Sequence, residues 1–196
     1  MPLYPHDAET AAIMALAPVI PVLTVGSVED GLAQAKALVA GGLYAIEVTL
    51  RTAPALAAIQ AIAKNVPNAI VGAGTIVSVE QIDQAVKAGA RFLVSPGAPA
   101  TLAKAAAQSP VPFLPGCATA SEAMALRELG FRALKLFPAE AVGGAKLIAS
   151  LAAPLPDLRF CPTGGIDLQL TDKSSTNVGY PPVCSVILRT QFPDES

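Results

Sequence analysis

An apolar run at positions 45–51 carries polar side chains at every second position. Glu47, Thr49 and Arg51 alternate there with aliphatic residues. Because alternate residues of a strand share a face, a strand at this place has one wholly polar face. If this strand belongs to a barrel, the fold predicted below, both of its faces are covered. A polar face must then point into the barrel interior near an open end, where a carboxylate and a guanidinium can bind a ligand. The competing interpretation is an internal Glu47–Arg51 pair that only balances its own charge.

A lysine stands in a second apolar run, Ala133–Phe137. Leu134, Leu136 and Phe137 flank Lys135, so a strand here would hold the amine in apolar surroundings. Desolvation disfavours the ammonium form, and a neutral amine attacks a ketone or an aldehyde to give a Schiff base. The competing interpretation is a solvated lysine at the end of a strand.

Two glycine-rich segments, Gly72–Thr75 and Pro162–Gly165, follow apolar runs. Backbone N–H groups on such segments suit a phosphate, which barrels commonly bind in the loops after their late strands. Any tight turn also favours glycine, so a purely structural role stays open. Ser95–Gly97 and Pro115–Gly116 end two further runs in the same way.

The histidine content and the charge exclude several classes of function. His6 is the one histidine of the chain, which argues against Ser-His-Asp triads and histidine-based metal clusters. With 13 basic and 15 acidic side chains, the formal net charge is −2, so nucleic-acid binding is not expected. The apolar stretches end well before the about 18 residues that a membrane span requires, so no membrane association is expected.

The cysteines and the N-terminal residues predict a cellular location. Cys117, Cys161 and Cys184 are widely spaced and form no C-x-x-C motif, which favours a reducing, cytoplasmic setting. Cys117 and Cys161 are predicted to be core thiols rather than nucleophiles. Met1–Glu9 lacks the basic and apolar regions of a signal peptide.

Short apolar runs alternate with alanine-rich helical stretches along most of the chain. The expected strands are Val19–Val25, Leu43–Leu50, Ala69–Ala73, Phe92–Val94, Val111–Leu114, Ala133–Phe137 and Leu158–Cys161. The expected helices are Val28–Ala40, Pro54–Asn65, Val79–Ala88, Pro99–Gln108, Ala120–Leu129 and Gly144–Ala153. Gly41, Gly89 and Gly130 stand where helices end and where a left-handed residue is favoured.

This alternation predicts an α/β fold, a parallel sheet covered by helices. Strand starts recur about every 20–25 residues, the length of one strand, one helix and two short loops. The number of repeats favours a (β/α)8 TIM barrel. An open doubly wound sheet is the alternative, although no G-x-G-x-x-G follows the first expected strand.

The chain divides into three regions by composition. Residues 1–17 are expected to form an N-terminal helical leader, and residues 18–166 the first seven strands of the barrel with their helices. Residues 167–196 are atypical, since no alanine occurs after Ala153. An eighth strand is possible at 183–188, but no amphipathic helix follows it, so the last strand–helix unit is expected to be altered or incomplete.

Five motifs together resemble a known family of class I aldolases. They are Glu47-Val-Thr-Leu-Arg51, Gly72-Ala-Gly-Thr75, Ser95-Pro-Gly97, Lys135-Leu-Phe-Pro-Ala-Glu140 and Phe160-Cys-Pro-Thr-Gly-Gly-Ile166. The family acts on 2-keto-3-deoxy-6-phosphogluconate (KDPG) in the Entner–Doudoroff pathway and also on 4-hydroxy-2-oxoglutarate (KHG). The resemblance implies a homotrimer of (β/α)8 barrels that needs no metal or cofactor and forms pyruvate and glyceraldehyde 3-phosphate.

The resemblance also implies a role for each matching residue. Lys135 would form the Schiff base with the C2 ketone, and Glu47 would be the proton shuttle. Arg51, assisted by Thr75, would hold the pyruvyl carboxylate. The pocket would be lined by Pro96, Phe137 and Thr163. The backbone N–H groups of Gly164 and Gly165 would bind the substrate phosphate.

The sequence departs from the family pattern near its end. The family completes its phosphate site with a Gly-Gly-Ser turn after the eighth strand, and no second Gly-Gly occurs after Gly165. Two alternatives follow from this departure. One is an aldolase that prefers unphosphorylated 4-hydroxy-2-oxo acids, and the other is a non-catalytic barrel remnant.

Overall fold

The computed structural model describes residues 4–165 and 184–188. Its strands are β1 (Val19–Leu23), β2 (Ala45–Thr49), β3 (Ile70–Gly74), β4 (Leu93–Val94), β5 (Phe113–Leu114), β6 (Gly116–Cys117), β7 (Ala133–Leu136), β8 (Arg159–Pro162) and β9 (Cys184–Leu188). Its helices are α1 (Asp7–Met14), α2 (Val28–Ala40), α3 (Ala55–Asn65), α4 (Val79–Lys87), α5 (Ala100–Ala106), α6 (Ala120–Glu128) and α7 (Gly144–Ala152), with a 3-10 turn, η1 (Glu140–Val142). Strands and helices alternate from β1 to β8 as the sequence predicts, except that no helix separates β5 from β6.

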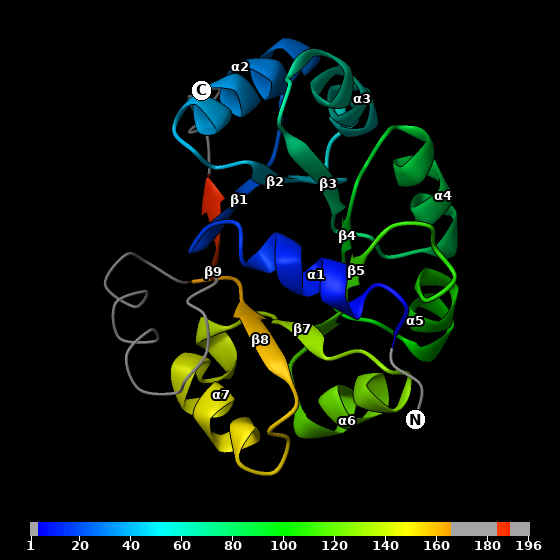
Figure 1. The fold of residues 1–196 in the computed structure, drawn as a ribbon, viewed down its shortest axis with the longest axis vertical. Helices are drawn as coiled ribbons and strands as arrows, with labels where there is room; N and C mark the ends of the chain where they lie inside the picture. Colours follow the sequence, from blue (N-terminus) through cyan, green and yellow to red (C-terminus); the bar gives the residue numbers. More distant parts are fainter. Residues whose placement is uncertain (1–3, 166–183, 189–196) are drawn as a thin grey trace, which may run out of the picture.

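The strands form a closed, parallel arrangement. One hydrogen-bonded sheet has the order β5-β4-β3-β2-β1-β9, and a second has the order β6-β7-β8. β5 and β6 follow each other directly in the chain around Pro115, and β8 lies beside β9. The two sheets therefore meet at both edges, and the helices α2–α7 surround them as an outer ring (Figure 1). This is a barrel and not an open doubly wound sheet.

β9 occupies the eighth strand position of this barrel. It runs parallel to β1 over its whole length, from the pair Val19–Cys184 to the pair Leu23–Leu188. The strand lies in the segment 183–188, where the sequence suggests a possible eighth strand. The rest of the region at 166–196, including the expected change in the last strand–helix unit, lies outside the described residues.

The helices begin and end where local chemistry places them. Ser27, Ser78 and Thr119 cap α2, α4 and α6 by accepting a hydrogen bond from a backbone N–H of the first turn. Gly89 and Gly130 have the predicted left-handed φ values of +93° and +99°. The prediction for Gly41 is wrong by one position, because its φ is −83° and Gly42 has the positive value of +85°.

α1 closes the end of the barrel at which the strands begin (Figure 1). Its Met14 joins a buried cluster inside the barrel with Ile20 and Ala45, which stand near the starts of β1 and β2, and with Ala133, the first residue of β7. The barrel interior is therefore apolar at this end. The other end, where the strands finish, is left for polar side chains.

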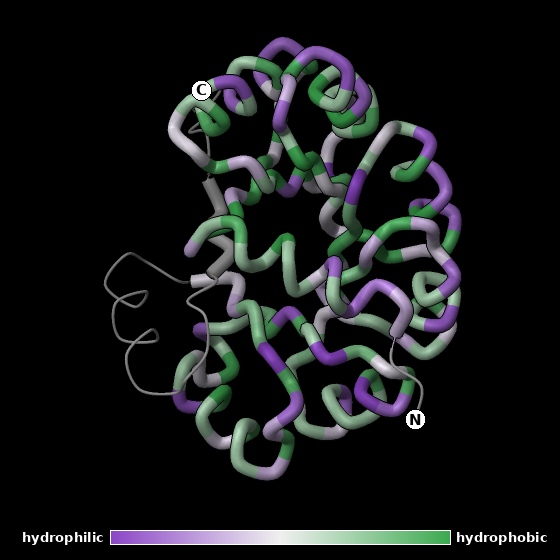
Figure 2. The backbone as a smooth tube through the Cα atoms, viewed as in Figure 1, coloured by the Kyte–Doolittle hydropathy of each residue, from purple (hydrophilic) through white to green (hydrophobic). Residues whose placement is uncertain are grey.

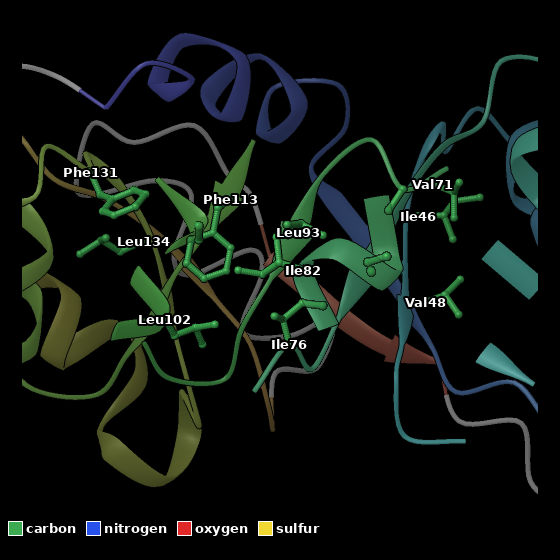
Figure 3. Close-up of a cluster of buried hydrophobic side chains, with 14 of the residues drawn as sticks. Ile46, Val48, Val71, Ile76, Ile82, Leu93, Leu102, Phe113, Phe131 and Leu134 are labelled. Carbon is green, nitrogen blue, oxygen red and sulfur yellow. The ribbon is translucent and has the colours of Figure 1, made fainter. Parts of the chain in front are cut away.

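The larger core lies between the strands and the surrounding helices. Figure 2 shows hydrophilic and hydrophobic positions alternating along these helices, as amphipathic helices require. In α3 the buried residues are Ala55, Ala58, Ile59 and Ile62, which share one helical face. Figure 3 shows side chains of this core, among them Ile76, Ile82 and Leu93 lying beside one another. This packing fixes the strands and so positions the side chains that point inward.

Candidate active site

Two charged side chains meet inside the barrel. Glu47 lies in the middle of β2, Lys135 lies in β7, and the Nζ of Lys135 donates a hydrogen bond of 3.4 Å to Oε1 of Glu47. Glu47 is 1% exposed and Lys135 is 5% exposed. The two alternatives considered above are therefore wrong, since Lys135 is not a solvated lysine and the ionic partner of Glu47 is Lys135 rather than Arg51.

Gly74 of β3 makes room for the Glu47 carboxylate. β2 and β3 pair in register, with Glu47 opposite Gly72 and Thr49 opposite Gly74. A Cβ atom at Gly74 would collide with the Glu47 side chain. The sequence analysis missed this role, because it placed Gly72–Thr75 in a turn, whereas β3 continues to Gly74. The signal that could have found it is strand register, since an inward glycine beside an inward glutamate leaves space for the larger side chain.

Two buried oxygen atoms at the site lack a hydrogen-bond partner among the described residues. They are Oε2 of Glu47 and Oγ1 of Thr163, and Thr163 is 1% exposed. Buried polar atoms are nearly always hydrogen-bonded in folded proteins. These two atoms are therefore suited to bind a polar ligand or water.

Phe137 and Thr163 directly follow the paired strands β7 and β8. The ring centroid of Phe137 is 5.7 Å from Nζ of Lys135, a distance at which an aromatic face attracts a cation. The N–H of Thr163 donates to the carbonyl of Leu136 at 2.9 Å, and the N–H of Ala139 donates to the carbonyl of Thr163 at 2.8 Å. These bonds hold the segments after β7 and β8 together.

Arg51 lies just beyond β2 and not on it. β2 ends at Thr49, so the predicted strand face does not extend to Arg51, which is exposed. Its Nε donates a hydrogen bond of 3.2 Å to Oγ1 of Thr75. Thr75 has a φ of +59°, a conformation that is uncommon for a residue other than glycine and that is often found at functional sites. The structure thus brings Arg51 and Thr75 together, as the resemblance implies.

Pro96 is held against the segment that contains β6. The buried hydroxyl of Ser95 accepts a hydrogen bond of 3.2 Å from the N–H of Gly116, and a Cβ atom at Gly116 would collide with the Pro96 backbone. The sequence analysis predicts Pro96 as pocket lining but assigns no role to Ser95. A serine directly after an expected strand is the sequence signal that could have predicted the role of Ser95.

Gly164 and Gly165 adopt backbone conformations that suit glycine. Their φ values are +95° and +74°, and a side chain at Gly165 would meet the Glu140 carboxylate. The N–H of Glu140 donates to the carbonyl of Gly164 at 3.0 Å. The glycine segment therefore packs against the segment that follows Lys135 and Phe137.

Among the residues that the structure describes, the other potential ligands and nucleophiles form no second centre. Burial raises the pKa of the Cys117 thiol to about 12, so this side chain stays protonated and serves as a core residue, as predicted. Cys161 is also buried. Within residues 4–165, no cluster of three or more histidine, cysteine, aspartate or glutamate residues could hold a metal. In the same part of the chain, no helix is long and apolar enough to span a membrane.

A parallel barrel with a buried lysine beside a carboxylate fits the class of enzymes that form a Schiff base with a carbonyl substrate. Comparison with known proteins identifies the family. The sequence matches the family described as "Aldolase: KDPG and KHG aldolase" over residues 10–176. The chain belongs to this family, which confirms the predicted family and the predicted enzyme class, an aldehyde-lyase.

Individual relatives agree with this assignment. The chain is 49% identical over 155 residues to the KHG/KDPG aldolase of Escherichia coli (strain K12), a match that covers 79% of this chain and 73% of that protein. The structure superposes with a TM-score of 0.85 and 41% identity on the KDPG aldolase of Zymomonas mobilis ZM4 with 3-phosphoglycerate, covering 96% of this chain and 90% of the other. A KDPG aldolase from Legionella pneumophila, which holds pyruvate as a covalent carbinolamine intermediate, gives a TM-score of 0.85 and 38% identity over 89% of this chain and 84% of that one. The predicted barrel is thereby confirmed.

Proposed function

We propose that this aldolase cleaves KDPG to pyruvate and glyceraldehyde 3-phosphate, with Lys135 as the Schiff-base residue. The observation that carries the proposal is the buried contact of 3.4 Å between Nζ of Lys135 and Oε1 of Glu47. A carboxylate at this distance can take up a proton from the amine, and the uncharged amine is the form that attacks a ketone. The closed, apolar interior below the pair keeps bulk water away from it.

The proposed reaction uses the two residues in sequence. The uncharged Lys135 amine attacks C2 of the substrate to give a carbinolamine. Glu47 gives the proton that it took from the amine to the carbinolamine hydroxyl, which leaves as water, so an iminium ion and a free carboxylate result. Glu47 then takes the proton of the C4 hydroxyl, directly or through a water, while the C3–C4 bond breaks and its electron pair moves toward the iminium nitrogen. The products are the aldehyde and an enamine. Glu47 returns the proton to C3, and hydrolysis releases pyruvate and the free amine. General acid–base assistance of this kind contributes roughly 10²–10⁴-fold to the rate.

The remaining residues are proposed to bind the substrate. Arg51 would hold the pyruvyl carboxylate by a forked contact, supported by the hydrogen bond that its Nε donates to Thr75. Pro96, Phe137 and Thr163 would line the pocket. The backbone N–H groups of Gly164 and Gly165 would bind the phosphate, and the positive φ values of both glycines support this role.

Trapping with pyruvate tests the proposal. Borohydride reduction in the presence of pyruvate is expected to leave a reduced pyruvyl group on Lys135, detected by peptide mass spectrometry. Lys135→Ala is expected to abolish trapping and cleavage together. Glu47→Gln is expected to retain trapping while cleavage slows by at least 10²-fold or so, the lower limit of the acid–base contribution.

Lys104→Ala is the matched control, because Lys104 is an exposed lysine of α5; it should behave as the parent protein. Trapping at a lysine other than Lys135, or equal losses of trapping in Glu47→Gln and Lys135→Ala, would contradict the assigned roles.

A preference for unphosphorylated 4-hydroxy-2-oxo acids is the second candidate. It is favoured by the sequence after Gly165, where Gly179 is the one remaining glycine, so no second Gly-Gly turn is present for the phosphate. The ratio of kcat/KM for KDPG to kcat/KM for KHG decides between the two. A ratio well below one supports the second candidate, and a ratio well above one supports the first.

We further propose that the protein is a cytoplasmic homotrimer that acts on small 2-keto acids and sugar phosphates and needs no cofactor. The family assignment and the lysine–glutamate site support this, since a Schiff-base mechanism draws its electron sink from the lysine itself. Light scattering after size-exclusion chromatography measures the subunit number, and activity in the presence of a chelator tests the need for a metal.

A further inference from the structure

Two threonine hydroxyl groups form a directed hydrogen-bond chain at the end of β1 and β2. The Oγ1 atoms of Thr24 and Thr49 are 3.0 Å apart. Oγ1 of Thr49 also donates a hydrogen bond of 3.0 Å to the carbonyl oxygen of Leu23. Neither residue has a role in the proposed reaction.

The direction of this chain follows from counting protons. A threonine hydroxyl has one proton and two acceptor lone pairs, and a carbonyl oxygen only accepts. The Thr49 proton is committed to Leu23, so Thr24 must donate its own proton to Thr49 if both contacts are to be hydrogen bonds. Thr24 is then left with unused lone pairs and no proton, so that it acts only as an acceptor toward a further partner.

Strand register places this acceptor on the face that carries Glu47. Val22 pairs with Glu47 and Leu23 with Val48, so Thr24 comes opposite Thr49, two residues beyond Glu47 on β2. Alternate strand residues share a face, so Thr49 follows Glu47 on the inward side of β2. Thr24 is the first residue after β1, and its contact of 3.0 Å with Thr49 holds its hydroxyl beside that face. Thr49 is fully buried, whereas Thr24 is half-buried, so Thr24 is the member of the pair that a ligand can reach.

We propose that Thr24 accepts a hydrogen bond from a hydroxyl group of the substrate. The inference rests on the proposed function, because it concerns the ligand of the same site. An acceptor-only hydroxyl recognises a donor and disfavours a carboxylate, a phosphate or a keto oxygen at the same place. It therefore selects a hydroxylated 2-keto acid, the substrate of cleavage, and makes no such contact with pyruvate, which has no hydroxyl group.

Two reactions of the same site separate this role from a general one. Cleavage uses the hydroxylated substrate, whereas exchange of the pyruvate methyl protons in D2O requires the same Schiff base and enamine but no substrate hydroxyl. Thr24→Val keeps the shape of the side chain and removes the hydroxyl. It is expected to lower kcat/KM for cleavage by about 3- to 10-fold, the usual worth of one neutral hydrogen bond, and to leave the exchange rate unchanged.

Two further variants control the experiment. Thr24→Ser retains the hydroxyl and is expected to restore cleavage. Thr52→Val removes a comparable half-buried hydroxyl, which donates to the carbonyl of Val25 at 2.8 Å, and is expected to change neither reaction.

The proposal is overturned if Thr24→Val leaves cleavage unchanged, or if it slows exchange and cleavage in proportion, since Thr24 would then act on the shared chemistry or on the fold. If the parent protein fails to trap pyruvate at Lys135, the proposed function itself fails, and that result is distinct from both.

Discussion

At the scale of single residues, the site depends on glycines as much as on charged side chains. The carboxylate of Glu47 occupies the space beside Gly74 that any other residue would fill with its own Cβ atom. The strand register that sets Gly74 opposite Thr49 also keeps this space next to the Lys135 contact. The orientation of the Glu47 carboxylate is therefore determined by the neighbouring strand.

Gly74→Ala is expected to displace Glu47 and to slow cleavage strongly. Overpacking of a filled interior typically costs about 1–3 kcal/mol, and relief by rotation of the carboxylate would move Oε1 away from Nζ of Lys135. The kinetic constants and the melting temperature measure the two effects. Gly41→Ala is the control, since Gly41 has a negative φ and is bounded only by its own helix carbonyls at 3.4 Å and 3.6 Å. Full activity in Gly74→Ala would contradict the assigned role of the glycine.

From the sequence it is easier to predict which residues point into the barrel than to predict the contacts that they make there. Alternation in the apolar runs places Glu47 and Lys135 on inward faces, because a strand repeats every two residues. It also extends the same face to Arg51, where the chain has already left β2. The Lys135–Glu47 contact joins strands that are not neighbours in the sheet order, and a pattern within one strand contains no information about such a contact.

At the scale of elements, local capping chemistry sets the helix boundaries. Thr119 accepts from the N–H of Glu122 at 3.3 Å, and Oε2 of Glu122 accepts from the N–H of Thr119 at 2.9 Å. This reciprocal pair satisfies two backbone donors that α6 leaves without helical partners. Since such bonds join residues close in sequence, most helices were predictable to within a residue or two. The left-handed residue after α2, which is Gly42 rather than Gly41, was not predictable, because either glycine can adopt this conformation.

Thr119→Ala is expected to lower the free energy of unfolding by about 1 kcal/mol, the usual effect of losing a side-chain cap. For a domain of this size, the melting temperature should fall by about 2–4 °C. Calorimetry measures the change. Thr101→Ala, an exposed threonine within α5, is the control and should be neutral or slightly stabilising, because alanine is the better helix former. An equal loss in both variants would show that the cap contributes nothing of its own.

At the scale of the whole molecule, α1 and the preceding residues tie the beginning of the chain to distant strands. The hydroxyl of Tyr4 accepts a hydrogen bond of 3.0 Å from the N–H of Phe113, and Oδ1 of Asp7 accepts one of 3.0 Å from the N–H of Arg132. These contacts span more than a hundred residues of sequence. The sequence analysis predicts a helical segment within residues 1–17, but not that it closes the barrel, since closure depends on contacts between residues this far apart in the sequence.

Burial of two acidic groups predicts that the fold loses stability at alkaline pH. Burial raises the pKa of Cys117 to about 12 and that of Tyr4 well above its usual range. In the unfolded chain, these groups lose their protons near their ordinary values of 9.0 and 10.0. Above those values the unfolded state binds fewer protons than the folded state, so the free energy of unfolding falls as pH rises, by up to about 1.4 kcal/mol per pH unit for each group.

Urea unfolding between pH 8 and pH 11 or so measures this loss, which should be absent at the lower limit and steepest at the upper one. Tyr4→Phe and Cys117→Ala each remove one group, so each should flatten the alkaline slope even where it lowers stability at neutral pH.

Tyr4→Phe also leaves the N–H of Phe113 without its acceptor, which costs about 1–3 kcal/mol at every pH. The two effects of this variant therefore separate by pH: a constant offset reports the hydrogen bond that ties the chain start to β5, and a change of slope reports the buried phenol. A slope equal to that of the parent protein in both variants would mean that neither group stays protonated because of the closed fold.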